Sequence, residues 1–297
     1  MKKLTHQQKS SLLYFNKKFK EWNVKSSSKQ YNVIIDRLKT TFHTFKKISD
    51  KINFLDIGCG TGQLSIIMSK KNKVKTSLGI DFAENMVIQS KKNNKKLNAK
   101  AKFIHGSFFN LEFKKKYNLI SAHGFIEYIS ADELKLFFKT LSKITEKNGF
   151  ISIGSRNRLF NIFSSNQFTI NETDKDKISL IKEMVEINKF SNIKNFLDQK
   201  LCRLYKIFKK HPVTGVKVSQ RNQFTPFELS KLVEKFGFKV TEIYPVNYHS
   251  IIPSLLNNKN LYKNIYEKDA LLISNFFQKE FSLLNSSSSF ILEAKKK

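Results

Sequence analysis

The sequence predicts an α/β fold built on a parallel β-sheet, and two observations support this. Short β-branched or apolar runs alternate with helical patterns from Ile52 to about Gly154, which is typical of successive β-α-β units. Eight of the ten glycines also fall between Gly58 and Gly154, mostly where the apolar runs end. Because open α/β sheets bind ligands at the carboxyl ends of their strands, we expect a ligand site at this edge.

Five strands are expected in the alternating region, and a sixth follows later in the chain. They are Asn53–Ile57, Thr76–Ile80, Ala101–His105, Tyr117–Ser121, Phe150–Gly154 and Phe238–Pro245.

Two helices have clear start signals. SADE at 130–133 matches a capping box ahead of apolar residues at helical spacing over 134–144, and we expect Asn148-Gly149 to close this helix. TPFE at 225–228 starts the second helix with a proline at its first position, and Gly237 ends it.

The changes in pattern along the chain predict five segments. They are an N-terminal helical segment (1–50) anchored by Tyr14, Phe15 and Trp22, a ligand-binding core (51–155), a lysine-rich insertion or lid over the site (156–223), a C-terminal part of the core sheet (224–285) and a loose basic tail (286–297).

The formal charge of +30 suggests a nucleic-acid partner, but its make-up does not favour one. Only five of the 54 basic residues are arginine, and the enrichment in Lys, Asn, Ile and Phe is the bias expected of coding DNA rich in A and T. No run of 18 apolar residues and no secretory signal is apparent. The two cysteines indicate neither a disulfide framework nor a zinc site. We therefore expect a cytoplasmic protein without a transmembrane segment.

The stretch FLDIGCGTGQLS places three glycines within five residues directly after the first strand. A tight turn needs one glycine, so three in alternation indicate a backbone that closely approaches a polar ligand. The dinucleotide fingerprint G-x-G-x-x-G would require a glycine at Gln63, whereas the spacing here is G-x-G-x-G preceded by Asp56.

This motif resembles the first motif of the class I S-adenosylmethionine-dependent methyltransferases, and the resemblance covers residues 51–155. It implies a Rossmann-like, doubly wound, mostly parallel seven-stranded sheet with N-terminal helices and an inserted cap, and it implies S-adenosylmethionine as cofactor. The cofactor-binding residues that it implies are Asp56, Gly58, Cys59, Gly60, Gly62, Asp81, Phe82, Met86, Ser107 and Phe108.

Within this set, Asp81 ends the second strand, where a carboxylate can accept both ribose hydroxyls; a helix N-cap is its structural alternative. Phe82 and Met86 are expected to bracket the adenine. Ser107 stands where relatives usually carry Asp, and either its hydroxyl or the Phe108 backbone can take that role.

Methyl transfer from a sulfonium requires alignment of the acceptor, and a base when the acceptor is a hydroxyl. His123, Glu127 and His249 are the candidate catalytic residues. Glu127 lies where quinone-type O-methyltransferases place the acid of a Glu-His pair, but Tyr128 replaces the histidine, so we expect no metal site.

Four of the five arginines lie in or border the insertion. Arg156 and Arg158 directly follow the fifth strand, and a guanidinium suits a carboxylate or phosphate. We therefore expect both to bind an anionic acceptor. The alternative is a salt-bridge network with Glu172, Asp174 or Asp176.

The leading functional hypothesis is methyl transfer to an oxygen of a small, anionic acceptor, since the pattern from Arg221 to Pro226 is similar to that of ubiquinone-type methyltransferases. One alternative is an RNA methyltransferase, favoured by the charge. Another is a relative that binds the cofactor but serves as a scaffold, for which Ser107 and Asn118 depart from the family pattern.

Overall fold

The computed structural model describes residues 4–27, 33–190, 192–208, 221–255 and 258–297. Its main sheet has seven strands in the order β3-β2-β1-β4-β5-β9-β8, and β9 is antiparallel to both of its neighbours. The strands are β1 (Ile52–Ile57), β2 (Val74–Asp81), β3 (Lys102–His105), β4 (Tyr117–His123), β5 (Thr145–Arg156), β8 (Phe238–Tyr248) and β9 (Ser287–Lys296). This confirms the predicted doubly wound α/β fold and all six expected strands.

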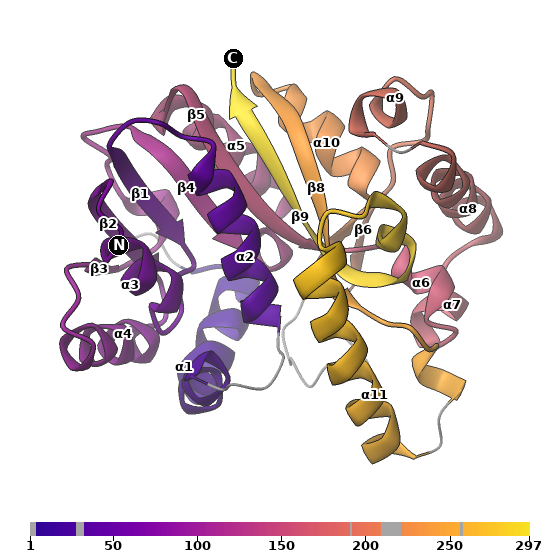
Figure 1. The fold of residues 1–297 in the computed structure, drawn as a ribbon, viewed down its shortest axis with the longest axis horizontal. Helices are drawn as coiled ribbons and strands as arrows, with labels where there is room; N and C mark the ends of the chain where they lie inside the picture. Colours follow the sequence, from indigo (N-terminus) through magenta and orange to yellow (C-terminus); the bar gives the residue numbers. More distant parts are fainter. Residues whose placement is uncertain (1–3, 28–32, 191, 209–220, 256–257) are drawn as a thin grey trace.

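Helices cover the sheet and extend beyond its edges (Figure 1). The α-helices are α1 (His6–Ser27), α2 (Val33–Lys46), α3 (Gln63–Ser69), α4 (Glu84–Lys96), α5 (Ala131–Ile144), α6 (Phe160–Phe163), α7 (Gln167–Asn171), α8 (Asp174–Lys189), α9 (Ile193–Leu197), α10 (Pro226–Glu234) and α11 (Lys259–Leu272). The short helices are η1 (Phe108–Asn110), η2 (Ile126–Tyr128), η3 (Pro253–Leu255), η4 (Ile273–Phe277) and η5 (Phe281–Ser286), and a two-stranded ribbon pairs β6 (Tyr205–Phe208) with β7 (Arg221–Phe224). Among the helices described, none has both the length and the apolar character that crossing a membrane requires.

The predicted helix starts are confirmed. Ser130 and Glu133 form both bonds of the capping box of α5, and Thr225 caps α10 ahead of Pro226. The predicted end of α5 is wrong: the helix ends at Ile144, and Asn148-Gly149 lies within β5, where the register with β4 shifts. Asn148 has a φ of 63°, so this pair makes a turn in the strand and not a helix cap.

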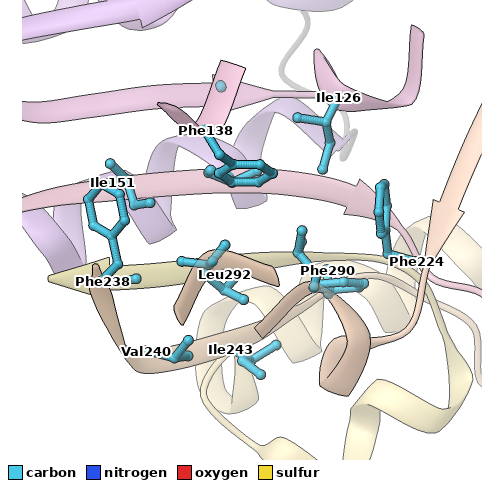
Figure 2. Close-up of a cluster of buried hydrophobic side chains, with 14 of the residues drawn as sticks. Ile126, Phe138, Ile151, Phe224, Phe238, Val240, Ile243, Phe290 and Leu292 are labelled. Carbon is cyan, nitrogen blue, oxygen red and sulfur yellow. The ribbon is translucent and has the colours of Figure 1, made fainter. Parts of the chain in front are cut away.

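The prediction of a loose tail at 286–297 is also wrong. Residues 287–296 form β9, which pairs with β5 on one side and β8 on the other. Figure 2 shows Phe290 and Leu292 of β9 among side chains of β5 and β8, and both residues are fully buried. The polar hydroxyls of the serine run suggested a flexible linker. In the structure Ser287, Ser288 and Ser289 lie in β9, where strand pairing supplies hydrogen bonds to the backbone and the side chains are buried.

The N-terminal helices predicted for residues 1–50 are confirmed, but α2 buries a polar face. Thr40, Thr41 and Thr44 are fully buried. Thr44 donates to the buried carboxylate of Glu293 on β9 at 2.7 Å, and Lys47 donates to the same carboxylate at 2.7 Å. This charged contact ties α2 to the antiparallel strand.

The insertion, residues 156–223, folds into α6–α9 and the β6-β7 ribbon, and residues 209–220 lie outside the described part. Its centre is a buried ion pair in which Arg158 donates to Glu172 at 2.5 and 3.1 Å, with Asp176 at 3.2 Å from the same guanidinium. Arg158 is only 2% exposed. This ion pair joins the segments around α6, α7 and α8, while Leu180, Ile187 and Phe196 of the insertion pack into the main hydrophobic cluster.

Two buried carboxyl groups meet between α8 and α10. Glu183 accepts a hydrogen bond from the Phe227 amide at 2.9 Å, and one oxygen each of Glu183 and Glu228 has no hydrogen-bond partner among the described residues. Burial raises the pKa of Glu183 to about 7. Burial and the neighbouring Glu183 raise the pKa of Glu228 to about 8.

Phe290→Ala should lower the free energy of unfolding by about 3–5 kcal/mol, because it leaves a cavity beneath the central sheet. The matched control is Phe276→Ala, since Phe276 is 73% exposed whereas Phe290 is buried. Urea unfolding followed by circular dichroism measures both values. Equal, small effects would contradict the placement of β9 in the core.

The carboxyl pair should make stability depend on pH. Both pKa values lie above the ordinary value of 4.5. The contribution of the two protonated carboxyl groups to the free energy of unfolding is therefore fully present below about pH 4.5 and is lost as the pH rises through 7 to 8. We expect Glu228→Gln to reduce the loss of unfolding free energy between about pH 5 and pH 9. The exposed Glu280→Gln is the control, and an identical pH profile for wild type and Glu228→Gln would refute the interpretation.

Candidate active site

A cavity of about 410 Å³ lies at the carboxyl ends of β1, β2, β4 and β5, within the size range of small-molecule sites. The strand order reverses between β1 and β4, and this switch point is where doubly wound sheets bind ligands. The first 38 residues supply the opposite wall of the cavity, through α1 and α2. In Figure 1, α1 lies below the sheet beside α4, whereas α6–α9 lie at the far right.

The described elements that cover the cavity are therefore α1 and α2. Within the described part of the insertion, only Arg156 and Arg221 line the cavity. Helix α1 is held at η2 by a bond from Gln7 to the Tyr128 carbonyl at 2.9 Å, and at α4 by a bond from Asn93 to Asn23 at 2.8 Å. The described part of the insertion thus contributes two arginines to the cavity and packs mainly against the core around Phe227 and Phe238. Residues 209–220 of the predicted lid lie outside the described residues, so the lid stays a prediction.

The glycine-rich loop is bound to the second strand and is open to the cavity. The amides of Gly58 and Cys59 donate to the Ile80 carbonyl at 2.8 and 3.0 Å. Gly62 has a φ of 84°, and a β-carbon there would lie 2.7 Å from the Phe103 ring. Gly60 has a φ of 53°, and a β-carbon there would meet nothing within 4 Å. The bare backbone at Gly60 therefore faces space that a ligand can fill.

Two carboxylates support this loop. Asp81 accepts from the amides of Gly60 and Ala83 at 2.8 and 2.9 Å, so it joins the loop to the turn that leads into α4. The N-cap of α4 is Ala83, so the structural alternative of a helix N-cap at Asp81 is wrong. Asp56 lies beneath, accepting from Ser65 and Ser121 at 2.9 and 2.6 Å. Burial raises the pKa of Asp56 to about 6, and it raises the pKa of Asp81 as well.

The remaining expected cofactor residues line the same cavity. Met86 is buried beside Phe82, while the Phe108 ring packs edge-on against Phe109 and Phe137. Ser107 accepts from the Phe109 amide at 3.4 Å and caps η1. The carboxamide of Asn118, which departs from the family pattern, accepts from the Asn53 amide at 2.8 Å and links β4 to β1.

The cysteine of the loop is buried, and its sulfur lies 3.8 Å from the Gly60 carbonyl oxygen. Burial raises the pKa of the Cys59 thiol well above its ordinary value. Cys59 therefore fills space within the loop and is not a nucleophile.

His123 lies at the end of β4 beside the cavity, as expected, but its ring faces the sheet. Its Nε2 is 2.8 Å from the Ser152 hydroxyl, and its Nδ1 is buried without a hydrogen-bond partner among the described residues. Burial and the nearby Arg37 lower the pKa of His123 to about 3. This environment disfavours proton uptake by His123, and its role as a general base stays a prediction.

Glu127 also lines the cavity, but it is bound to Arg221. Arg221 donates to one Glu127 oxygen through Nε at 2.7 Å and through a second nitrogen, and both side chains are buried. Burial is the largest influence and opposes the charge on Arg221, but Glu127 together with Tyr128 and Tyr14 raises the pKa of Arg221 above its ordinary value. The ion pair corrects the expectation of Glu127 as a catalytic base.

Three other predicted residues lie outside the cavity lining. Gly62 instead faces the Phe103 ring, as described above. Arg158 forms the ion pair with Glu172 described above, so the salt-bridge alternative is confirmed for this arginine and the acceptor role is wrong. His249 bonds through Nδ1 to the Tyr262 hydroxyl at 2.5 Å and packs on Phe160, so the structure corrects its expected catalytic role.

Three lining residues were missed in the sequence. Arg37 of α2 lies against Gly124, where a β-carbon would be 3.0 Å from its guanidinium. Tyr14 and Tyr128 line the cavity with it. Arg37 is one of only five arginines, and this rarity was the available signal.

The sequence matches a family model described as methyltransferase domain over residues 48–226, more than half of the chain. The chain belongs to the methyltransferase domain family. This confirms the resemblance to class I S-adenosylmethionine-dependent methyltransferases, and S-adenosylmethionine is the cofactor.

Solved structures share the fold at low sequence identity. A magnesium protoporphyrin IX methyltransferase from Synechocystis, crystallised with S-adenosylhomocysteine, has a TM-score of 0.55 and 11% identity, over 99% of this chain and 100% of that one. A S-adenosylmethionine-dependent methyltransferase from Clostridium acetobutylicum has a TM-score of 0.53 and 13% identity, over 94% of this chain and 98% of that one. At such identity these likenesses show the fold alone.

A release factor glutamine methyltransferase from Buchnera aphidicola is 29% identical over 150 residues, which is 48% of this chain and 53% of that protein. The chain thus spans about half the length of this curated relative.

The cavity residues fit S-adenosylmethionine. The open space at Gly60 admits the cofactor beside the loop backbone. Asp81 accepts bonds from backbone amides, and a carboxylate has about four acceptor positions, so capacity remains for ribose hydroxyls. Phe82 and Met86 provide apolar contact for the adenine ring of the cofactor. These residues would hold the cofactor, which supplies the methyl group on a sulfonium.

Asp81→Asn should raise the dissociation constant of S-adenosylhomocysteine about 10- to 100-fold, because charge-assisted bonds to the ribose are lost. Asparagine keeps one oxygen for the Gly60 amide and loses only the acceptor of the Ala83 amide, and an unchanged circular dichroism spectrum would show that the fold is retained. Isothermal titration calorimetry measures the constant, with Asp132→Asn, on the exposed first turn of α5, as control. An unchanged constant would contradict the ribose assignment.

Proposed function

We propose that the protein transfers the methyl group of S-adenosylmethionine to an oxygen of a small anionic acceptor. The observation that carries this proposal is the arginine distribution. Three of the five arginines, Arg37, Arg156 and Arg221, line the cavity described above, whereas Lys25 is the only lysine in its lining among the residues that the structure describes. The high lysine content is explained by the composition bias of the chain, but that bias does not explain why three arginines line one cavity.

The charges around Arg156 favour an anion. Burial and repulsion from Arg221 lower the pKa of Arg156 to about 10. Glu127 attracts both guanidinium groups and is bonded to Arg221. A bound anion would stabilise the charged form of Arg156, since opposite charges attract strongly in a partly buried site.

The body of the acceptor should be apolar or aromatic. Helix α1 presents Ser11, Phe15 and Trp22 to the cavity at helical spacing, and α2 adds Val33 and Ile34. Phe15 stands edge-on to Tyr128, with ring centroids 5.1 Å apart. Such walls bind flat or apolar bodies, while the guanidinium fixes orientation.

The arginines divide between two ligands. Arg37 interacts electrostatically with Glu127 and Tyr128, as Arg156 does, but its guanidinium also lies against Gly124 and acts on Asp56 beneath the glycine-rich loop. We assign it to the carboxylate of the cofactor's amino-acid portion because of this second position. Arg156, at the end of β5, acts on Glu127 and Tyr128, and we assign it to the acceptor. The enzyme's own part in catalysis is then to align two charged ligands and exclude water.

A reciprocal pair of variants tests this division. Arg156→Gln should raise the concentration of anionic metabolites that half-saturates methyl transfer by about tenfold or more, with cofactor affinity unchanged, because one charge-assisted contact is lost. Arg37→Gln should instead weaken binding of S-adenosylhomocysteine by a similar factor.

The readouts are calorimetry and transfer of labelled methyl to the small-anion fraction of a cell extract. Arg203→Gln is the control, because Arg203 lies in the same insertion but is exposed and does not line the cavity. Acceptor kinetics unaltered in Arg156→Gln would refute the proposal.

A further inference from the structure

We propose that the methylated group is a carboxylate of the acceptor, so that the product is a methyl ester. This inference rests on the function proposed above and specifies its substrate class. It comes from the state of the proton-accepting side chains around the cavity. In the described part of the chain, the His, Asp and Glu residues that line it are Asp56, Asp81, His123, Glu127 and Glu133.

Three of these carboxylates serve the fold. Asp56 accepts from two serine hydroxyls and is 5% exposed. Asp81 closes the glycine loop through the Gly60 amide. Glu133 accepts from the Ser130 amide at 2.8 Å in the capping box, and also from Gln8. Taking a proton from a ligand would weaken each of these contacts.

Glu127 is committed to Arg221. If Glu127 took a proton, the buried guanidinium of Arg221 would lose its bonded counter-charge, which is strongly unfavourable. A base must also lie within hydrogen-bond reach of the proton that it removes. His123 is a poor proton acceptor, because Nε2 contacts the Ser152 hydroxyl and because burial and the neighbouring Arg37 lower its pKa to about 3.

An acceptor hydroxyl would have to give up a proton in this setting, whereas a carboxylate would not. Carboxylic acids ionise near pH 4, so the acceptor arrives already as an anion. It is then both the group that Arg156 recognises and the nucleophile. One oxygen can bond to the guanidinium while the other attacks the methyl group.

The step balances without a proton. A lone pair of the carboxylate oxygen forms the new O–C bond, the C–S bond breaks, and its electron pair returns to sulfur. The sulfonium and the carboxylate neutralise each other and give an ester and the thioether S-adenosylhomocysteine. Methylation of a hydroxyl would release one proton per turnover.

The test uses the full chain, S-adenosylmethionine labelled on its methyl group, and a cell extract separated into small anions, other metabolites, RNA and protein. Each labelled fraction is then treated with mild alkali. Methyl esters hydrolyse and release volatile labelled methanol, but ethers and methylamines do not. Asp81→Asn, which should bind the cofactor weakly, is the negative control.

We expect label in the small-anion fraction and its release as methanol. Label in that fraction that resists alkali would overturn the carboxylate inference and leave the proposed function standing. Label in RNA or protein, or in no fraction, would overturn the proposed function and this inference with it.

Proton release provides an independent measurement on the labelled acceptor once it is purified. A pH indicator in weak buffer should record no proton for each methyl group transferred. One proton per turnover would contradict a carboxylate acceptor.

Discussion

The ion pair between Glu127 and Arg221 is the contact on which the cavity depends. It joins η2, which follows β4, to β7, which ends the insertion, and the two segments are far apart in the sequence. Asn222 adds bonds to the carbonyls of Ile126 and Ile129 at 2.8 and 2.7 Å. Loss of one partner of a buried pair costs about 3–5 kcal/mol, so this contact fixes the cavity wall.

The same pair determines the electrostatic character of the site. The carboxylate of Glu127, which the sequence suggested as a catalytic base, is bound to Arg221, and the guanidinium of Arg221 adds a second positive charge near Arg156. The site is therefore suited to hold a negative ligand and unsuited to remove a proton. The ion pair between Glu127 and Arg221 therefore both fixes the cavity wall and sets the charge inside it.

Much of the cofactor half could be predicted from the sequence because its determinants are local. The strand, the three glycines and Asp81 lie within one β-α-β unit, where spacing alone fixes which groups meet. The acceptor half was harder to predict because it is assembled from distant segments. Arg156 and Arg158 are two residues apart, yet one lines the cavity and the other pairs with Glu172. Only tertiary packing separates them.

The position of β9 has a consequence for the order of assembly. Phe150 of β5 pairs with Lys295 of β9, and β8 pairs with the other edge of β9. Until β9 inserts, β5 is therefore paired only with β4, and β8 has no partner in the sheet. Such non-local pairing slows folding, and the two unpaired edges are templates for association with other chains. Refolding at low protein concentration should therefore give better yields than refolding at high concentration.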